Sequence, residues 1–125
     1  EATDKAKILP AHIYVAPPDY HLLVEEDNTL SIGLFDPVCY SRPSVDVLFE
    51  SAAEIYQHQL VGIILSGANS DGAMGLKHVK DCRGVTVVQD PLEAEFKRMP
   101  QSAIKATKVD YVLSKKEILS FLLAL

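Results

Sequence analysis

One aspartate stands where an α/β protein carries a catalytic side chain. Asp71 follows an apolar run that begins at Val61, small residues surround it in the loop 66–72, and helical spacing follows. In parallel α/β sheets, the loops that leave the carboxyl ends of the strands build the active site. A carboxylate there can orient a histidine and stabilise its charged form, or it can cap the helix that follows. The residues alone leave both interpretations open.

The chain offers poor partners for a self-contained catalytic triad. Ser66 and Ser70 flank Asp71, but neither lies in the Gly-x-Ser-x-Gly turn that exposes a nucleophile. Four histidines are present. His12 and His21 fall in the predicted ribbon, His58 lies near the end of a predicted helix, and His78 lies far along the helix that follows Asp71. We find no metal-ligand spacing among them or with cysteine, so we predict no metal and no cofactor.

Composition narrows the class of protein. With 125 residues, 48% of them hydrophobic and 23% charged, the chain fits one globular domain. A net charge of −5 without a basic stripe argues against nucleic-acid binding. No apolar run approaches the roughly 20 residues that span a bilayer, so we expect no membrane insertion. Cys39 and Cys82 are far apart in sequence, and we expect free thiols in a reducing cytoplasm.

Periodicity predicts the elements that position Asp71. Strands are expected over residues 12–16, 21–25 and 30–35, paired as an antiparallel ribbon. An amphipathic helix follows from Ser44, and strands are expected over 60–65, 84–88 and 109–113. Helices are expected over 72–81, within 91–107, and after the capping box of Ser114 and Glu117. The predicted fold class is α/β, a doubly wound parallel sheet with helices on both faces, plus an antiparallel β-ribbon that extends the sheet or folds over one end.

Six ordered motifs then resemble a known family. They are Tyr14-Val-Ala-Pro-Pro-Asp-Tyr-His-Leu22, Ser41-Arg-Pro-Ser-Val-Asp-Val-Leu-Phe49, Leu65-Ser-Gly-Ala-Asn-Ser-Asp-Gly-Ala73, Val88-Gln-Asp-Pro91, Met99-Pro-Gln-Ser-Ala-Ile104 and Val109-Asp-Tyr-Val-Leu113. Together they resemble the catalytic domain of CheB-type protein-glutamate methylesterases. That resemblance implies a Ser-His-Asp triad that hydrolyses glutamyl methyl esters on chemotaxis receptors, and in some members deamidates receptor glutamines.

The resemblance also assigns roles to residues. Asp71 matches the aspartate of the triad, and Gly67 and Ala68 match the loop that supplies a backbone N–H to the oxyanion hole. The family's serine and histidine motifs precede the region matched here. We therefore expect residues 1–125 to be the C-terminal two-thirds of a methylesterase domain, without its nucleophile and histidine segment.

The loops around Asp71 raise further alternatives. Arg42 and Arg98 could steer anionic receptor helices, lie near the glutamate product or be solvated surface arginines. Met99 could line a substrate channel or fill a gap in the core. Gln89 and Asp90 could border the site or cap the next segment. Arg98 stands where the family usually has glycine, and its added bulk and charge near the site are expected to affect substrate preference rather than reaction type.

The sequence therefore predicts a cytoplasmic methylesterase that acts on methylated cytoplasmic helices of chemotaxis receptors. Its oligomeric state is left open. A non-catalytic adaptor on the same scaffold is the alternative from another class. A small-molecule esterase is a third possibility, and it would be indifferent to methylated receptor peptides.

Overall fold

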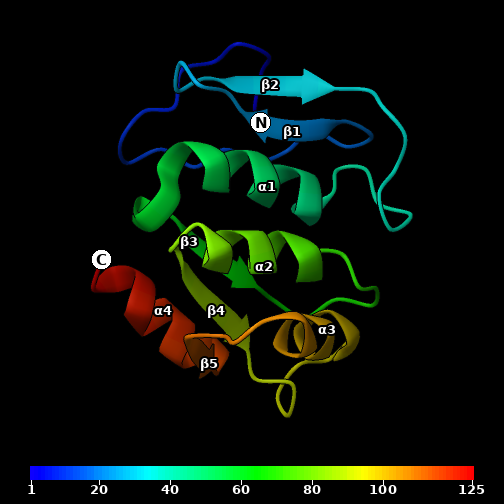
Figure 1. The fold of residues 1–125 in the computed structure, drawn as a ribbon, viewed down its shortest axis with the longest axis vertical. Coiled ribbons are helices and arrows are strands. Elements are labelled where there is room, and N and C mark those ends of the chain that lie inside the picture. The colour runs from blue at the N-terminus through cyan, green and yellow to red at the C-terminus, as the bar shows by residue number, and fades with distance from the viewer.

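The computed structural model describes every residue from Glu1 to Leu125. Two strands precede a long helix, and three strand–helix units follow it (Figure 1). In chain order the elements are β1 (His21–Val24), β2 (Leu30–Gly33), α1 (Val45–Tyr56), the 3₁₀ turn η1 (Gln57–Gln59), β3 (Val61–Ile64), α2 (Ala73–Asp81), β4 (Val85–Gln89), α3 (Arg98–Ala106), β5 (Tyr111–Leu113) and α4 (Lys115–Leu123).

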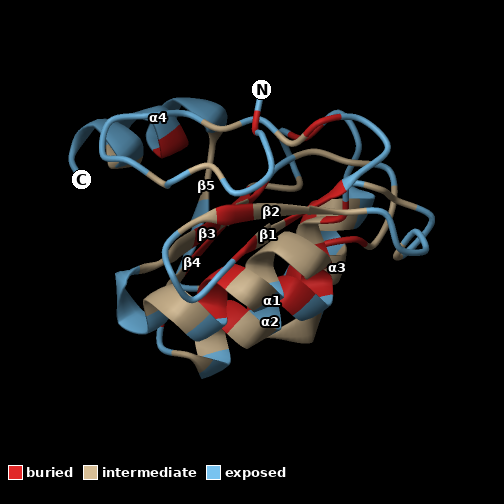
Figure 2. Cartoon of the chain, turned by 90° about the horizontal axis from the view of Figure 1, so that it is seen from above, coloured by how far each residue is buried: buried red, intermediate tan, exposed pale blue.

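The second half forms a parallel sheet in the order β3-β4-β5. Ile64 pairs with Val88, and Val88 pairs with Val112 across the central strand. The strands are rich in valine and isoleucine because helices cover the sheet. Figure 2 shows α1 and α2 on one side of the strands and α4 on the other. The predicted fold class, a parallel α/β sheet with an added antiparallel ribbon, is confirmed.

The ribbon forms a sheet of its own. β1 and β2 pair antiparallel, with His21 opposite Gly33, and neither strand pairs with the parallel sheet. Leu22 and Val24 of β1 instead pack with Ala52 of α1 in a small hydrophobic cluster. The ribbon therefore covers α1 rather than extending the sheet, and α1 lies between the ribbon and α2 (Figure 1).

The predicted strand over residues 12–16 is wrong. This segment has no regular secondary structure, and the side chain of Ile13 is 92% exposed. Val15 accepts a backbone hydrogen bond from Ala2 at 2.8 Å, but no ladder follows. Residues that favour β structure need a neighbouring strand to pack against, and none lies beside this segment.

Both helix starts predicted from local sequence are confirmed. Ser44 is the N-cap of α1, and its Oγ accepts a long bond from the N–H of Val47 at 3.5 Å. At α4, Ser114 and Glu117 form the capping box, with bonds of 3.2 and 3.0 Å. No helix has the length and apolar content needed to cross a membrane.

Candidate active site

Asp71 lies in the loop between β3 and α2, at the carboxyl edge of the parallel sheet. Its side chain is buried, and the N-terminus of α1 holds both carboxylate oxygens. Oδ1 accepts bonds from Ser44 Oγ at 2.8 Å and from the N–H of Asp46 at 3.0 Å, and Oδ2 accepts from the N–H of Val45 at 2.6 Å. Asp71 is thus a cap for α1, since it satisfies N–H groups that no turn of that helix can reach.

A second carboxylate returns the interaction. Asp46, in the first turn of α1, accepts bonds on Oδ1 from the N–H groups of Gly72 at 3.0 Å and Gly75 at 2.6 Å, at the start of α2. Each helix N-terminus is therefore capped by a carboxylate from the other helix segment. The expectation that Asp71 might cap the helix that follows it is wrong, because Gly72 is the N-cap of α2 and provides no side-chain bond.

Close packing makes this exchange possible. A Cβ at Gly75 would lie 2.9 Å from Asp46 Cα, which is backbone and cannot move aside. At Gly72 the φ angle is +96°, in the region that glycine adopts without strain. The two glycines let the first turns of α1 and α2 approach closely enough to share their capping groups.

Both carboxylates lie at a helix N-terminus, Asp71 at that of α1 and Asp46 at that of α2. Burial raises the pKa of Asp46, the bond from the Gly75 N–H opposes that rise, and the nearby charge of Asp71 adds to it. Asp71 faces the N-terminal end of α1, where the helix dipole favours negative charge. The start of α1 therefore fixes the orientation of the Asp71 carboxylate at the edge of the sheet.

Asp71 has capacity for one further donor. A carboxylate offers about four lone-pair positions, and α1 occupies two on Oδ1 and one on Oδ2. The remaining position on Oδ2 has no donor within this chain. An imidazole is the partner that a triad carboxylate orients in this way.

The loop that carries Asp71 is fixed by its own side chains. Asn69 Oδ1 accepts the N–H of Asp71 at 2.9 Å, and Asn69 Nδ2 donates to Ser41 Oγ at 3.0 Å. Gly67 is tied by backbone bonds to Phe96 and Met99, both 3.0 Å. Ala68, which lies between Gly67 and Asn69, is exposed, and its N–H donates to no group of the chain. The loop therefore presents a free N–H on a restrained backbone, as an oxyanion hole requires.

Neighbouring polar residues have structural partners. Gln89 Oε1 accepts the N–H of Ser66 at 2.9 Å, and Ser66 Oγ accepts the N–H of Phe96 at 2.9 Å. Asp90 Oδ1 accepts the N–H of Leu92 at 3.0 Å. Gln89 thus holds the loop after β3, while Asp90 caps the segment that follows β4.

The two tentative substrate residues contact the scaffold. Arg42 is half-buried, and its Nη1 donates to the Phe35 carbonyl at 3.1 Å. Met99 packs against the core cluster that contains Ile64 and Val88. A Cβ at Gly67 would lie 2.0 Å from Met99 Sδ, so this side chain lies directly over the loop. A substrate role for Arg42 or Met99 stays a prediction.

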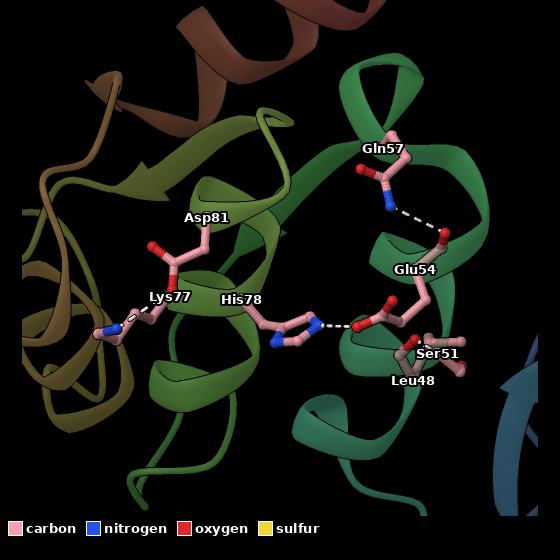
Figure 3. A network of polar contacts seen from close by, with 7 residues as sticks. All are labelled: Leu48, Ser51, Glu54, Gln57, Lys77, His78 and Asp81. Atoms are coloured by element: carbon pink, nitrogen blue, oxygen red, sulfur yellow. Dashed lines mark hydrogen bonds and ion pairs between the residues drawn. The ribbon is translucent and has the colours of Figure 1, made fainter.

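No histidine of the chain bonds to Asp71. His21 is fully buried in β1 and its Nε2 lies 3.0 Å from the Asp36 carbonyl, whereas His78 faces Glu54 on α1 (Figure 3). The expectation that no histidine has metal-ligand spacing is wrong for His78. Cys82 follows it by four residues, one helical turn, and Glu54 completes a cluster that sequence spacing alone does not reveal.

Fold and site together define a class: a parallel α/β domain with a buried, helix-bound carboxylate and a restrained backbone N–H at the carboxyl edge of its sheet. Comparison with known proteins then gives the family. The sequence model of the family described as "CheB methylesterase" matches residues 1–122. The chain belongs to the CheB methylesterase family.

Relatives agree in sequence and in structure. A putative protein-glutamate methylesterase/protein-glutamine glutaminase of Leptospira interrogans is 58% identical over 118 residues, covering 94% of this chain and 61% of the relative. The corresponding enzyme of Hydrogenovibrio crunogenus is 38% identical over 128 residues, covering 100% of this chain and 34% of the relative. The crystal structure of the Thermotoga maritima CheB methylesterase catalytic domain superposes with a TM-score of 0.94 at 32% identity, covering 99% of this chain and 67% of that one. The chain thus spans between one third and about two thirds of the length of these relatives.

Proposed function

We propose that this chain is the aspartate-bearing part of a protein-glutamate methylesterase that works through a Ser-His-Asp triad. The observation that carries the proposal is the state of Asp71. Its carboxylate is buried, three donors of α1 fix it at the carboxyl edge of the sheet, and one acceptor position on Oδ2 is left over. That position suits the N–H of a catalytic imidazole.

In this proposal the serine and the histidine come from residues outside the 125 given. The serine attacks the ester carbonyl while the imidazole takes its proton, and Asp71 holds the imidazole in the required tautomer. The free N–H of Ala68 stabilises the oxyanion, with Gly67 allowing the loop to pass under Met99. Collapse of the tetrahedral intermediate releases methanol, and water then hydrolyses the acyl-enzyme to return the glutamate carboxylate.

Residues 1–125 are proposed to be the C-terminal two-thirds of one domain. β3 is an edge strand of the parallel sheet, with β4 as its only partner. An apolar depression beside it is lined entirely by hydrophobic side chains, among them Leu22, Leu48 and Val61. Both features suit a sheet that continues with further strands, and the Thermotoga maritima domain is longer than the region it shares with this chain.

The proposed substrates are methylated cytoplasmic helices of chemotaxis receptors, with glutamine deamidation as a related reaction. This assignment rests on the relatives, which are named protein-glutamate methylesterase/protein-glutamine glutaminase. We propose a cytoplasmic location for the same reason. Arg42 and Met99 are retained as proposed substrate contacts, although their side chains also bind the scaffold.

One observation favours a second candidate, a non-catalytic adaptor. Every bond that Asp71 accepts in this chain comes from α1, so the side chain has a structural role that needs no histidine. An adaptor would use the same scaffold to bind a receptor or another protein without hydrolysis.

Two measurements separate these candidates. Purified protein carrying this sequence is treated with a fluorophosphonate probe, which labels activated serines, and is then incubated with receptor methylated on its glutamates. A methylesterase is labelled and releases methanol from the receptor. An adaptor binds the receptor but does neither. A protein that is labelled yet ignores the methylated receptor would be the small-molecule esterase.

A further inference from the structure

A second cluster of chemically active side chains lies away from Asp71. Glu54 is near the end of α1, while His78 and Cys82 lie one turn apart at the end of α2. Their ligand atoms all lie within 4.8 Å of one another, and His78 Nε2 is 2.7 Å from Glu54 Oε1. Figure 3 shows the imidazole and the carboxylate pointing toward each other between the two helices.

These ligand types favour a particular class of ion. Imidazole nitrogen, thiolate sulfur and carboxylate oxygen bind Zn²⁺ at about 2.0–2.3 Å, so ligand atoms around one tetrahedral ion lie about 3.5 Å apart. The separations here range from 2.7 Å between His78 Nε2 and Glu54 Oε1 to at most 4.8 Å, so side-chain rotations that move ligand atoms by about 1 Å bring them to that spacing. Mg²⁺ and Ca²⁺ prefer oxygen ligands throughout, so a site with nitrogen and sulfur discriminates against them.

The charges around the cluster suit a cation. Its three residues lie near the C-terminal ends of α1 and α2, where helix dipoles favour positive charge. The two nearest lysines of α2 are already engaged, Lys77 with Asp81 at 3.2 Å and Lys80 with Asp110 at 2.6 Å. The helix C-termini and the Glu54 carboxylate therefore favour a cation at this corner, although Arg83, next to Cys82, adds one positive charge there.

A metal ion can reach the cluster from solvent. The side chain of His78 is 36% exposed and that of Glu54 is 63% exposed. An ion can therefore reach the cluster without unfolding of either helix. Val45 and Glu54 are separated by about 13 Å along α1, so the cluster lies at the opposite end of the helix pair from the capping groups of Asp71.

We propose that Glu54, His78 and Cys82 form a binding site for a divalent transition-metal ion of the zinc class, with one coordination position left for water or a fourth ligand. The bound ion links α1 to α2 at their C-terminal ends, as the exchanged carboxylate caps link them at their N-terminal ends. The site is structural, and it is independent of the proposed hydrolytic function.

Cobalt titration tests the site directly. Co²⁺ bound by a thiolate gives an intense ligand-to-metal charge-transfer absorption, and the probe is Co²⁺ alone, added to reduced protein carrying this sequence and then displaced by Zn²⁺. We expect one equivalent to produce the band and Zn²⁺ to abolish it. Cys82→Ser removes the band, while His78→Ala and Glu54→Gln weaken Co²⁺ binding by at least about tenfold.

The second cysteine supplies a matched control. Cys39 is exposed and lies outside the cluster, so Cys39→Ser should keep both the band and the affinity. Zn²⁺ should also raise the thermal unfolding midpoint of the wild type and of Cys39→Ser, but not of Cys82→Ser or His78→Ala. The proposal is overturned if the wild type gives no thiolate band, if the band follows Cys39 instead, or if Zn²⁺ leaves the unfolding midpoint of the wild type unchanged.

Discussion

Substitution of Asp71 should destabilise the fold whether or not the protein is an enzyme. Asp71→Ala leaves the buried N–H of Asp46, the partly buried N–H of Val45 and the hydroxyl of Ser44 without their acceptor. An unsatisfied buried donor costs about 1–3 kcal/mol. The hydroxyl can rotate toward another acceptor and water can enter the space, so we expect a loss of about 3–5 kcal/mol in the free energy of unfolding. That is a large share of the roughly 5–15 kcal/mol typical of a domain.

Asp71→Asn removes the negative charge but keeps one acceptor oxygen, so it separates the effect of the charge from that of the hydrogen bonds. The amide has one oxygen, which can replace Oδ1 for Ser44 and Asp46, but its NH₂ group then faces the N–H of Val45. We expect a loss of about 1–3 kcal/mol. Asp90→Asn is the matched control, because the amide oxygen at residue 90 keeps the single bond to the Leu92 N–H.

Urea unfolding followed by far-ultraviolet circular dichroism measures these losses, since the chain has no tryptophan. Addition of Ser44→Ala to Asp71→Ala tests the coupling, and the double variant should be less destabilised than the sum of the two single variants. The reasoning is refuted if the free energy of unfolding of Asp71→Ala lies within about 0.5 kcal/mol of the wild-type value, which is typical of a surface substitution. It is also refuted if Asp71→Ala and Asp71→Asn have the same free energy of unfolding.

Three further predictions concern the helix pair and the sheet. Gly75→Ala should destabilise by about 1–3 kcal/mol although alanine favours helix, because its Cβ would meet Asp46 Cα at 2.9 Å; urea unfolding measures this. Because the pKa of Asp46 is raised in the folded state, its carboxyl keeps the proton to higher pH there than in the unfolded chain. The wild type should therefore lose stability relative to Asp46→Asn as the pH rises from about 4 through the folded pKa. Burial raises the pKa of Asp110, but bonds from Lys80 and Thr86 outweigh it and hold that pKa below its ordinary value. The advantage of the wild type over Asp110→Asn should therefore be present above about pH 4 and shrink as pH falls through the folded pKa.

Each of these has a clear contrary result. A stabilised Gly75→Ala would mean that α1 and α2 are not in close contact. Unfolding measured across the pH range would contradict the carboxylate assignments if the difference between wild type and Asp46→Asn were constant. The same holds for Asp110→Asn if its difference from the wild type grew as the pH fell.

Local signals in the sequence predicted most of the fold. The Ser114–Glu117 capping box and the Ser44 cap involve residues three apart, so spacing alone identifies them. The apolar strands before Asp71 and before Gln89 also appear as predicted. Residues 12–16 have strand-forming composition but no strand to pair with, and pairing is a property of the whole fold.

The contacts of the site depend on residues far apart in sequence. Asp71 and Val45 are 26 residues apart, and their bond follows from how α1 packs against α2. The sequence places Asp71 at the sheet edge but does not reveal that Asp46 caps the other helix. The His78–Cys82 spacing was a usable signal of a possible metal site, whereas the approach of Glu54 required the packed helices.

The central claim is that Asp71 is the triad carboxylate of a methylesterase, and the most direct test is the turnover of Asp71→Asn. Methanol release from methylated receptor is measured for the wild type, Asp71→Asn and Asp90→Asn, at a temperature and urea concentration where all three are folded. The account predicts that Asp71→Asn loses about 10⁴ in turnover, as when a serine-protease triad loses its aspartate, while Asp90→Asn retains wild-type turnover. Equal rates for folded Asp71→Asn and wild type would contradict it and leave Asp71 a structural cap alone.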